Sequence, residues 1–504
     1  MNRFHCLSFL FLLILVGPLN TDARGAQPSS APGPETSQPN VVLILSDDHG
    51  QWAMGCYGQE HVRTPNLDAM ARQGVLFSNA MSPAPVCSAA RSSFFTGRLP
   101  SQHGVHDFLS EAPEYDAQWL ENETLLSEKM QTLGYRTGLF GKWHCTTSST
   151  EPQRGFDRWL SYDACDEGWI NQYQHSGTVY FSDGGHRLDY TGFQANFLTS
   201  SAIDFMDEDD DRPFFLCLNL VEPHFPFEGL PERLVEHYRK VVQDIMPAGD
   251  SSEAKVLRPY AIMDRDHNEK LAQYLAAVTL IDEQVGRVWE ALEGRGMLDN
   301  TVVVYASDHG HLTGQYGMYG KTNASHPFNF YEETIRIPMI VMGPDALVWP
   351  GQVRHEFVDL CDLHQLFLEL GGKPQQEIID PKDGPGRSFL PLLKGQRLPG
   401  WRNFQFAEHG NGRMITDGRW KLVRYYNQDP AQLAVDYWYD LVHPLGERRV
   451  SPPPSQAIEK LLVENLESYF ATYENAPHSG RTVWRQPACN AGEPWRTETP
   501  VLGH

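Results

Sequence analysis

The sequence predicts an α/β fold, a sandwich in which helices cover a large, mostly parallel sheet, followed by a smaller α+β region. Two observations favour the sandwich: short apolar runs end in polar or charged residues, and helical patterns separate these runs along the chain. The third observation is the length of 504 residues, which exceeds the size at which one core usually stops growing. Two packed regions are therefore expected.

The predicted buried strands lie at residues 41–45, 135–140, 214–219 and 301–305. The first of them leads directly to Asp47 and Asp48, and the last leads in the same way to Asp308. Because the carboxyl ends of parallel strands meet at one edge of a sheet, where ligand sites collect, we expect these three acids to lie close together.

Helical patterns separate the predicted strands and lie at residues 66–73, 125–133, 202–206 and 270–292. Beyond residues 381–385 the pattern changes. Residues 414–426 are typical of a hairpin, and we expect a helix within residues 454–472. These observations predict a main domain over residues 39–385 and a C-terminal subdomain over residues 386–504.

The net charge of the chain is −23, from 41 Lys and Arg against 64 Asp and Glu. Such a balance argues against nucleic acid and against an anionic membrane surface as partners, because both repel an acidic protein. An anionic substrate would have to be attracted by a local positive pocket or by a bound cation.

The first 25 residues have the pattern of a signal peptide. Arg3 and His5 precede an apolar run over residues 7–16, and Ala23-Arg24-Gly25 offers a small-x-small cleavage site. Residues 26–38 are rich in Pro and Ser and are expected to form a disordered leader. We therefore expect an exported protein, periplasmic or extracellular, without stable membrane insertion, since the apolar run is too short to span a bilayer comfortably.

Cysteines elsewhere in the chain show no zinc-binding spacing. An exported protein can pair some of them, but the sequence does not fix the connectivity. The cysteines available for pairing are Cys56, Cys145, Cys165, Cys217, Cys361 and Cys489.

Three carboxylates at strand ends point to a bound metal. Asp47, Asp48 and Asp308 would repel one another and take up protons if no cation lay between them. Oxygen donors favour Ca²⁺ or Mg²⁺ over zinc, and several carboxylates with a flexible shell favour Ca²⁺. A single Asp after a strand is more often a helix cap or turn former, so the matched pair of strand ends carries this prediction.

One further run, from Cys87 to Arg98, resembles the modification site of the formylglycine-dependent sulfatases, in the alkaline-phosphatase-like superfamily. The family pattern is Cys-x-Pro-x-Arg with a distal Thr-Gly-Arg, and this chain keeps Cys87, Arg91 and Thr96-Gly97-Arg98, with Ala89 in place of the proline. A lone Cys-x-x-x-Arg is more often a buried thiol or half of a disulfide. Here the matches continue in family order from residue 41 to the C-terminal hairpin.

The resemblance implies a role for each candidate residue. Asp47, Asp48, Asp308 and His309 would hold calcium together with the oxygens of the modified Cys87; position 309 is asparagine in many members and histidine in others. Around that residue, Arg91 would hold the hydrated aldehyde, and Lys142 and His144 would contact it. His224 would protonate the departing alcohol, and Lys321 would bind a sulfate oxygen.

The implied protein is an exported sulfatase whose main domain is catalytic and whose substrate is a sulfated small molecule or polysaccharide, with a carbohydrate expected. A maturation enzyme would convert Cys87 into formylglycine. This aldehyde hydrates to a gem-diol, in which one hydroxyl attacks sulfur and the second later expels sulfate. Two alternatives stay open: a phosphonate monoester or phosphodiester hydrolase with the same nucleophile, and a calcium-dependent binder of sulfated glycan in which Cys87 stays unconverted.

Several other residues allow both a functional and a structural interpretation. His103, His106 and Asp107 would either line the substrate mouth or form a turn, and Arg98 would be either part of the site or a surface ion-pair partner. The candidate aromatic residues for stacking on a sugar are Tyr316, Tyr319, Trp349 and Trp401.

Overall fold

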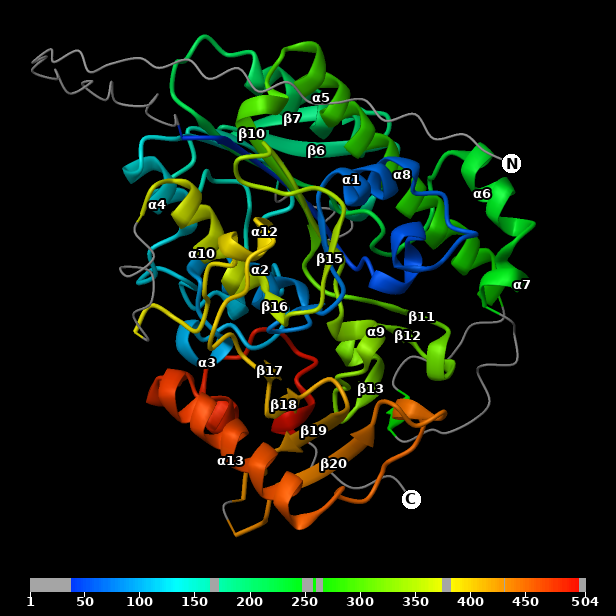
Figure 1. Ribbon diagram of the computed structural model, residues 1–504, viewed down its shortest axis with the longest axis vertical. Helices are drawn as coiled ribbons and strands as arrows, with labels where there is room; N and C mark the ends of the chain where they lie inside the picture. The colour runs from blue at the N-terminus through cyan, green and yellow to red at the C-terminus, as the bar shows by residue number, and fades with distance from the viewer. Residues whose placement is uncertain are drawn as a thin grey trace, which may run out of the picture. The chain divides into compact units, whose positions relative to one another are not determined.

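The computed structural model describes residues 38–163, 172–246, 257–259, 266–373, 382–429 and 431–497. Residues 38–504 belong to one compact unit (Figure 1). The predicted signal peptide, nearly all of the predicted leader, and Cys165 lie outside the described residues. Within the described residues, no helix is both long enough and apolar enough to cross a membrane.

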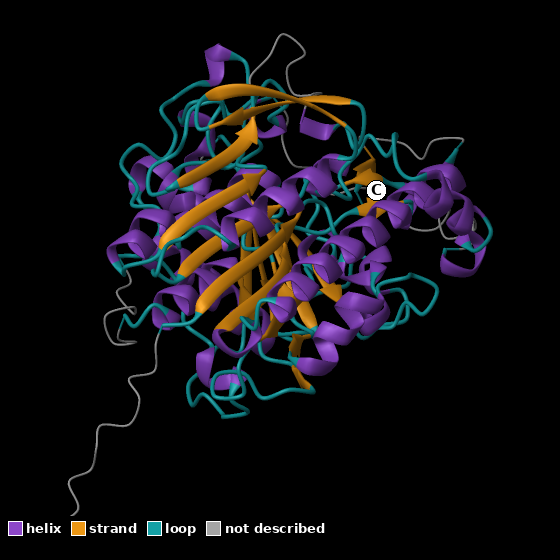
Figure 2. Cartoon of the chain, turned by 90° about the horizontal axis from the view of Figure 1, so that it is seen from above, coloured by secondary structure: helices purple, strands orange, loops and turns teal. Residues whose placement is uncertain are grey.

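A ten-stranded sheet forms the centre of the unit, with helices on both of its faces (Figure 2). Its five central strands are parallel to one another, which confirms the predicted α/β class with a mostly parallel sheet. In spatial order the strands are β15 (Gln352–Arg354), β2 (Val75–Phe77), β14 (Met339–Met342), β10 (Thr301–Ser307), β1 (Asn40–Ser46), β8 (Phe214–Asn219), β4 (Arg136–Gly141), β5 (Arg158–Tyr162), β6 (Thr178–Asp183) and β7 (His186–Thr191).

Strand β1 shows why the sheet is buried on both faces. Successive side chains of a strand point to opposite faces. Leu43 accordingly packs in one core with Phe94 of α2, while Ile44 packs in the other core with Leu275 of α8. A strand buried on both sides reads as an unbroken apolar run, which is why the sequence revealed it.

The helices cover the two faces and include all four that were predicted. α5 begins at Gln194, earlier than the expected residue 202. The helices of the main domain are α1 (Pro65–Gln73), α2 (Cys87–Thr96), α3 (Pro100–His103), α4 (Leu126–Thr132), α5 (Gln194–Met206), α6 (Glu232–Arg239), α7 (Val242–Ile245), α8 (His267–Gly294), α9 (Glu332–Ile335) and α10 (Leu360–Leu370), and α12 (Leu390–Leu393) follows the predicted boundary.

Short strand pairs outside the main sheet connect loops near its edge. They are β3 (Ala80–Met81) with β16 (Val358–Asp359), β9 (Arg258–Pro259) with β13 (Ser325–His326), and β11 (Leu312–Thr313) with β12 (Tyr319–Gly320).

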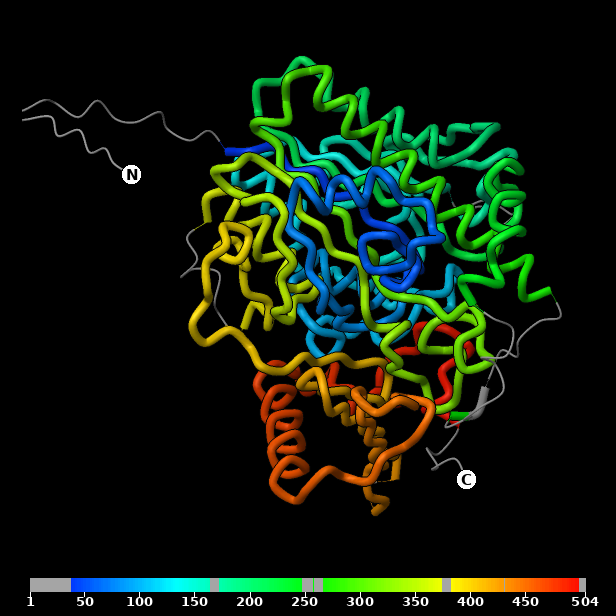
Figure 3. Tube along the Cα trace, turned by 45° about the vertical axis from the view of Figure 1, so that its right-hand side comes forward, coloured from blue at the N-terminus to red at the C-terminus, as the bar shows by residue number. Residues whose placement is uncertain are grey.

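The C-terminal region, drawn mostly in orange at the bottom of Figure 3, contains a separate four-stranded antiparallel sheet and a long helix. The predicted hairpin is β18 and β19, and the predicted helix is α13. The elements are β17 (Gln405–His409), β18 (Gly412–Thr416), β19 (Trp420–Tyr425), β20 (Val435–Asp440) and α13 (Gln456–Tyr473). After α13 the chain returns to the main domain, where Ser110 N donates to Cys489 O at 2.9 Å. The domain boundary at residues 385 and 386 stays a prediction.

The register of the central strands brings their polar ends to one edge. Ser46 of β1 pairs with Ser307 of β10, and Leu45 of β1 pairs with Asn219 of β8. Because all these strands are parallel, the residues that follow β1, β10, β8 and β4 emerge side by side.

Candidate active site

The three predicted acids lie together at this edge of the sheet, and all are buried. Asp48 N donates to Asp308 Oδ1 at 3.3 Å, which ties the loop after β1 to the loop after β10. Asp48 has φ = 67° and His144 has φ = 54°, a left-handed backbone that residues with side chains adopt rarely. Such conformations cluster at functional sites, where the surrounding structure holds them in place.

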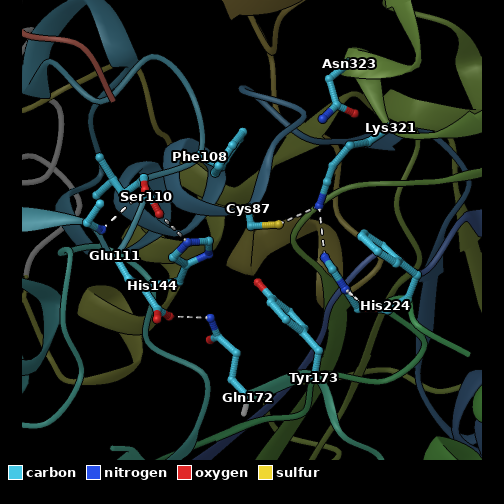
Figure 4. A pocket seen from close by; sticks show the side chains of 13 residues that line it. Cys87, Phe108, Ser110, Glu111, His144, Gln172, Tyr173, His224, Lys321 and Asn323 are labelled. Atoms are coloured by element: carbon cyan, nitrogen blue, oxygen red, sulfur yellow. Dashed lines mark hydrogen bonds between the residues drawn. The ribbon is translucent and has the colours of Figure 1, made fainter. Parts of the chain in front are cut away.

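Cys87 is the first residue of α2, and its thiol points toward Lys321 (Figure 4). Its Sγ lies 2.7 Å from Lys321 Nζ and 3.2 Å from His309 Nε2. Burial opposes ionisation of the thiol, but Lys142 and Lys321 outweigh it and hold the pKa of Cys87 well below its usual value. The helix N-terminus acts in the same direction, because its free N–H groups favour negative charge. The lysines and the helix N-terminus therefore favour a negative charge at position 87.

Arg91 lies one helical turn after Cys87, which explains the spacing of four in the motif. Its Nε donates to Asp308 Oδ2 at 2.9 Å and its Nη1 donates to Lys142 O at 3.0 Å. The guanidinium thus joins α2 to the loops after β10 and β4. Its position next to the first turn of α2 places its charge against residue 87.

Two buried lysines each pair with one of the strand-end acids. Lys142 Nζ forms an ion pair with Asp47 and donates to Tyr173 OH at 3.0 Å. Lys321 Nζ lies 2.9 Å from Asp48 Oδ1. Burial disfavours both ammonium groups, yet the adjacent carboxylates raise the pKa of Lys142 and of Lys321, so both stay charged.

The carboxylates fit a hard divalent cation. Asp47, Cys87, Asp308 and His309 each offer one ligand atom within 4.8 Å of the others, and Asp47, Asp48, Cys87 and His224 do the same. Within the described residues, Asp47 Oδ1 is buried without any hydrogen-bond donor, a costly arrangement unless a ligand satisfies it. Burial and the neighbouring Asp47 raise the pKa of Asp308 to about 6.

Two histidines face residue 87 from different loops. His144 Nε2 lies 3.0 Å from Leu109 O and must donate to it, because a carbonyl only accepts. In the neutral ring this leaves His144 Nδ1 as an acceptor, and the ring is hydrogen-bonded to Cys87. His224 Nε2 lies 3.5 Å from Lys321 Nζ, and its ring stacks on Tyr173 with centroids 4.0 Å apart.

These side chains form the floor of a pocket of about 610 Å³. Its floor contains Cys87, His144, His224 and Lys321. Its walls are formed by Phe108, Leu109, Ser110, Glu111, Ala112, Gln172, Tyr173, Phe225 and Asn323.

Two family models match the chain: "Sulfatase" over residues 39–373 and "N-sulphoglucosamine sulphohydrolase, C-terminal" over residues 314–448. The first covers more than half of the sequence. This chain belongs to the sulfatase family. It is a sulfuric ester hydrolase with the alkaline-phosphatase-like fold of that family.

Curated sulfatases and solved structures are similar over most of the chain. The N-acetylglucosamine-6-O-sulfatase of Bacteroides thetaiotaomicron is 26% identical over 81% of this chain and 81% of its own length. The human N-acetylgalactosamine-6-sulfatase is 30% identical over 74% of this chain and 68% of its own. A solved structure in complex with D-glucosamine-2-N,6-O-disulfate superimposes with a TM-score of 0.71 at 22% identity, over 88% of this chain and 100% of that chain.

The structure brings all the residues singled out for the sulfatase site into one cluster, while their individual roles stay predictions. Sequence reasoning missed His311 and Tyr173. His311 Nδ1 lies 3.2 Å from Asp48 Oδ2, and its position in the run after β10 was a usable signal. Tyr173 comes from a loop without any motif, so only the tertiary structure places it.

Other candidates lie away from the pocket. Arg98 is half-buried and pairs with Glu123 at 2.7 Å. Asp107 Oδ1 instead lies 3.0 Å from His409 Nε2, and the Nδ1 of that histidine lies 2.6 Å from Thr322 Oγ1. This network supports the turn interpretation of residues 103–107 and connects β17 to the residue after Lys321.

None of the four candidate aromatic residues for stacking on a sugar is among the described residues that line this pocket, so their role stays a prediction. Tyr316 is buried and stacks on Tyr331. Trp349 is exposed and lies next to Gly395. The six cysteines in the described residues, Cys87 included, are all unpaired.

Proposed function

We propose that this chain is an exported sulfatase that removes sulfate from a carbohydrate, with formylglycine formed from Cys87 as its nucleophile and a calcium ion beside it. The observation that carries the proposal is the position of Cys87 at the pocket floor. Its Sγ lies 2.7 Å from Lys321 Nζ, beside the strand-end acids. Similarity to proteins named as amino-sugar sulfatases supports the carbohydrate substrate. The N-terminal signal pattern supports export.

The aldehyde formed at residue 87 and the calcium ion would supply the central chemistry of the reaction. The hydrated aldehyde at residue 87 would supply the hydroxyl that attacks sulfur and the hydroxyl that later expels sulfate. Calcium, held by Asp47, Asp48, Asp308 and His309, would supply a Lewis acid.

The side chains of the protein bind the substrate and transfer the protons. Lys321 orients the sulfate and stabilises the charge on its oxygens, because it is fixed at the pocket floor before the substrate arrives. Lys142 lies behind the floor, paired with Asp47, and adds its positive charge at residue 87. His224 Nδ1–H is held by the carbonyl of Phe225, so the doubly protonated ring donates its Nε2 proton to the departing alcohol oxygen and is left neutral. His144 Nδ1, an acceptor beside residue 87, takes a proton from that residue's second hydroxyl. Arg91 holds residue 87 in place through α2.

Turnover and the state of Cys87 test the proposal together. The protein is produced with a formylglycine-generating enzyme and assayed on 6-sulfo-N-acetylglucosamine, 4-nitrophenyl sulfate, and the phosphate and phosphonate analogues of the latter. We expect sulfate esters to be preferred, a mass of the Cys87 peptide that shows the aldehyde, and a loss of at least about 1,000-fold in kcat/KM for Cys87→Ala with an unchanged fold.

Three outcomes would contradict the proposal. An intact thiol in active enzyme would exclude the nucleophile, and unchanged rates in Cys87→Ala would exclude the mechanism. Preference for the phosphonate ester would favour the alternative hydrolase.

A further inference from the structure

The upper part of the pocket differs in chemistry from its floor. The floor is cationic and binds the group that reacts, whereas Phe108, Leu109 and Phe225 make the walls largely apolar. One carboxylate, that of Glu111, stands among these walls (Figure 4). Among the described residues that line the pocket, no arginine occurs and the single lysine is Lys321, which already contacts Asp48 and Cys87.

Glu111 is held in a defined position by a chain of hydrogen bonds. Gln172 Nε2 donates to Glu111 Oε1 at 2.8 Å. Gln172 is itself buried, and its backbone carbonyl accepts from Gln194 Nε2 at 3.2 Å. Gln194, at the start of α5, accepts in turn from Tyr162 OH at 2.7 Å. The carboxylate is thus anchored to the main sheet through β5 and is not a mobile surface group.

This anchoring uses only part of the hydrogen-bonding capacity of Glu111. An ionised carboxylate offers about four acceptor sites, and Gln172 takes one of them. Burial raises the pKa of Glu111, and Lys142 offsets this only in part, so a donor from a bound ligand would relieve the desolvated carboxylate. Hydroxyl and N–H groups of a sugar are such donors, while a sulfate or carboxylate is not.

We propose that Glu111, held by Gln172, determines which sugar the enzyme accepts: it binds the hydroxyl or N–H groups of a monosulfated neutral or amino sugar and rejects sugars with a second anionic group. The inference rests on the proposed function and names its substrate class. A second sulfate would meet the Glu111 carboxylate and find no counter-charge on the described walls, and like-charge contact of this kind lowers affinity for the wrong ligand.

The test is a selectivity ratio. kcat/KM is measured for 6-sulfo-N-acetylglucosamine, for N,6-disulfoglucosamine and for 4-nitrophenyl sulfate, which has no sugar hydroxyl. We expect the native enzyme to prefer the monosulfated sugar by at least about tenfold. Glu111→Gln keeps the shape and removes the charge, so the ratio should fall about tenfold, while the rate on the aryl sulfate should change less than about twofold.

The matched control is Glu114→Gln, an exposed glutamate three residues further along that does not line the pocket. It should leave the ratio unchanged. An unchanged ratio in Glu111→Gln, or an equal loss on all three substrates, would overturn the inference, because the latter result is what a purely structural contact produces.

Binding separates this inference from the proposed function. The Kd of each sulfated sugar is also measured on Cys87→Ala and on the same variant with Glu111→Gln, where no turnover is needed. The ratio of the two Kd values should shift in the same direction by about tenfold. If converted protein hydrolyses no sulfate ester, the proposed function fails; if the Kd ratio does not move, the inference fails by itself.

Discussion

Two clusters of buried charge invite comparison: the active-site cluster at the edge of the main sheet, and a second cluster where the C-terminal sheet meets the main domain. The second is built around Lys421 of β19. Lys421 Nζ lies 2.6 Å from Glu332 Oε1 and 2.6 Å from Glu447 Oε1, and it donates to Phe330 O at 2.8 Å. Both clusters thus bury lysine against carboxylates.

The two clusters differ in the partners of their charged groups and in whether they face a pocket. In the second cluster, Glu332 also pairs with Arg336, and Glu447 Oε2 accepts from Glu332 N at 2.7 Å. These ion pairs connect α9 to β19 of the C-terminal sheet. At the sheet edge, Asp47 Oδ1 has no hydrogen-bond donor among the described residues, and Cys87 and Lys321 face a pocket. Burial of charge does not by itself indicate function; unused acceptors beside a cavity do.

The sharpest contrast should come from Asp48→Asn. We expect kcat/KM to fall about 1,000-fold, because a metal ligand and the partner of Lys321 are both lost. The melting temperature of the metal-free protein should fall as well, because Lys321 loses its buried partner, and the rise of the melting temperature on addition of calcium should disappear. The measurements are turnover and thermal unfolding with and without calcium.

The matched control is Asp282→Asn. The Asp282 carboxylate is also buried, but its Oδ1 accepts from Leu67 N at 2.8 Å and its Oδ2 from Asn66 Nδ2 at 2.9 Å. This variant should keep the calcium response. If both variants lose it, the metal site at residues 47, 48 and 308 is wrong.

Lys421→Met should lower stability but, unlike Asp48→Asn, should leave activity unchanged. Removing one partner of a buried ion pair leaves uncompensated carboxylates, so the free energy of unfolding should fall by about 3–5 kcal/mol. The kcat per formylglycine-containing molecule should stay within twofold, because the cluster contacts no pocket residue. Urea unfolding and active-site titration check this, and a large loss of kcat with unchanged stability would show that the clusters are not separate.

The smallest expected effect is a pH dependence that belongs to the second cluster. Burial raises the pKa of Glu447 to about 7, although Lys421 opposes this. A raised carboxyl pKa gives stability that is complete below the unfolded value of about 4.5 and is lost as pH rises through 7. The folded state holds the extra proton in this window, so stability should fall by up to about 1.4 kcal/mol per pH unit.

Glu447→Gln cannot ionise and should lack this slope. Denaturant unfolding of both proteins between pH 4.5 and 8 measures the difference. Parallel curves would mean that Glu447 is already ionised at pH 5, and that Lys421 controls its charge more strongly than burial does.

The two clusters also show which parts of the fold and of the site could be predicted from the sequence. β1 and β10 could be predicted because strands buried on both faces are unbroken apolar runs, and their polar ends located the acids. The spacing of Cys87 and Arg91 is one helical turn, which is local information. The contact of Lys421 with Glu332 and Glu447 joins three distant segments, and no pattern in any one of them indicates it.

The same limit applies to the pocket walls. Tyr173, Glu111 and Phe225 converge from three loops, and loops carry no periodicity that fixes a side-chain direction. The start of α5 was missed because residues 194–201 include polar and β-branched residues, which are weak helix formers until packing supports them. Aromatic residues such as Tyr316 were assigned to the pocket from their type alone, whereas burial in a core is their more common use.

The in-register pairing of β1 with β10 has a consequence for biosynthesis. Asp48 and Asp308 are 260 residues apart in sequence, and Lys321 follows still later. A ribosome adds about 5–20 residues per second, so Asp48 and Cys87 leave the exit tunnel many seconds before their partners exist. During this interval the thiol lacks the enclosure that buries it in the finished molecule, and the nascent chain cannot yet assemble a complete set of metal ligands.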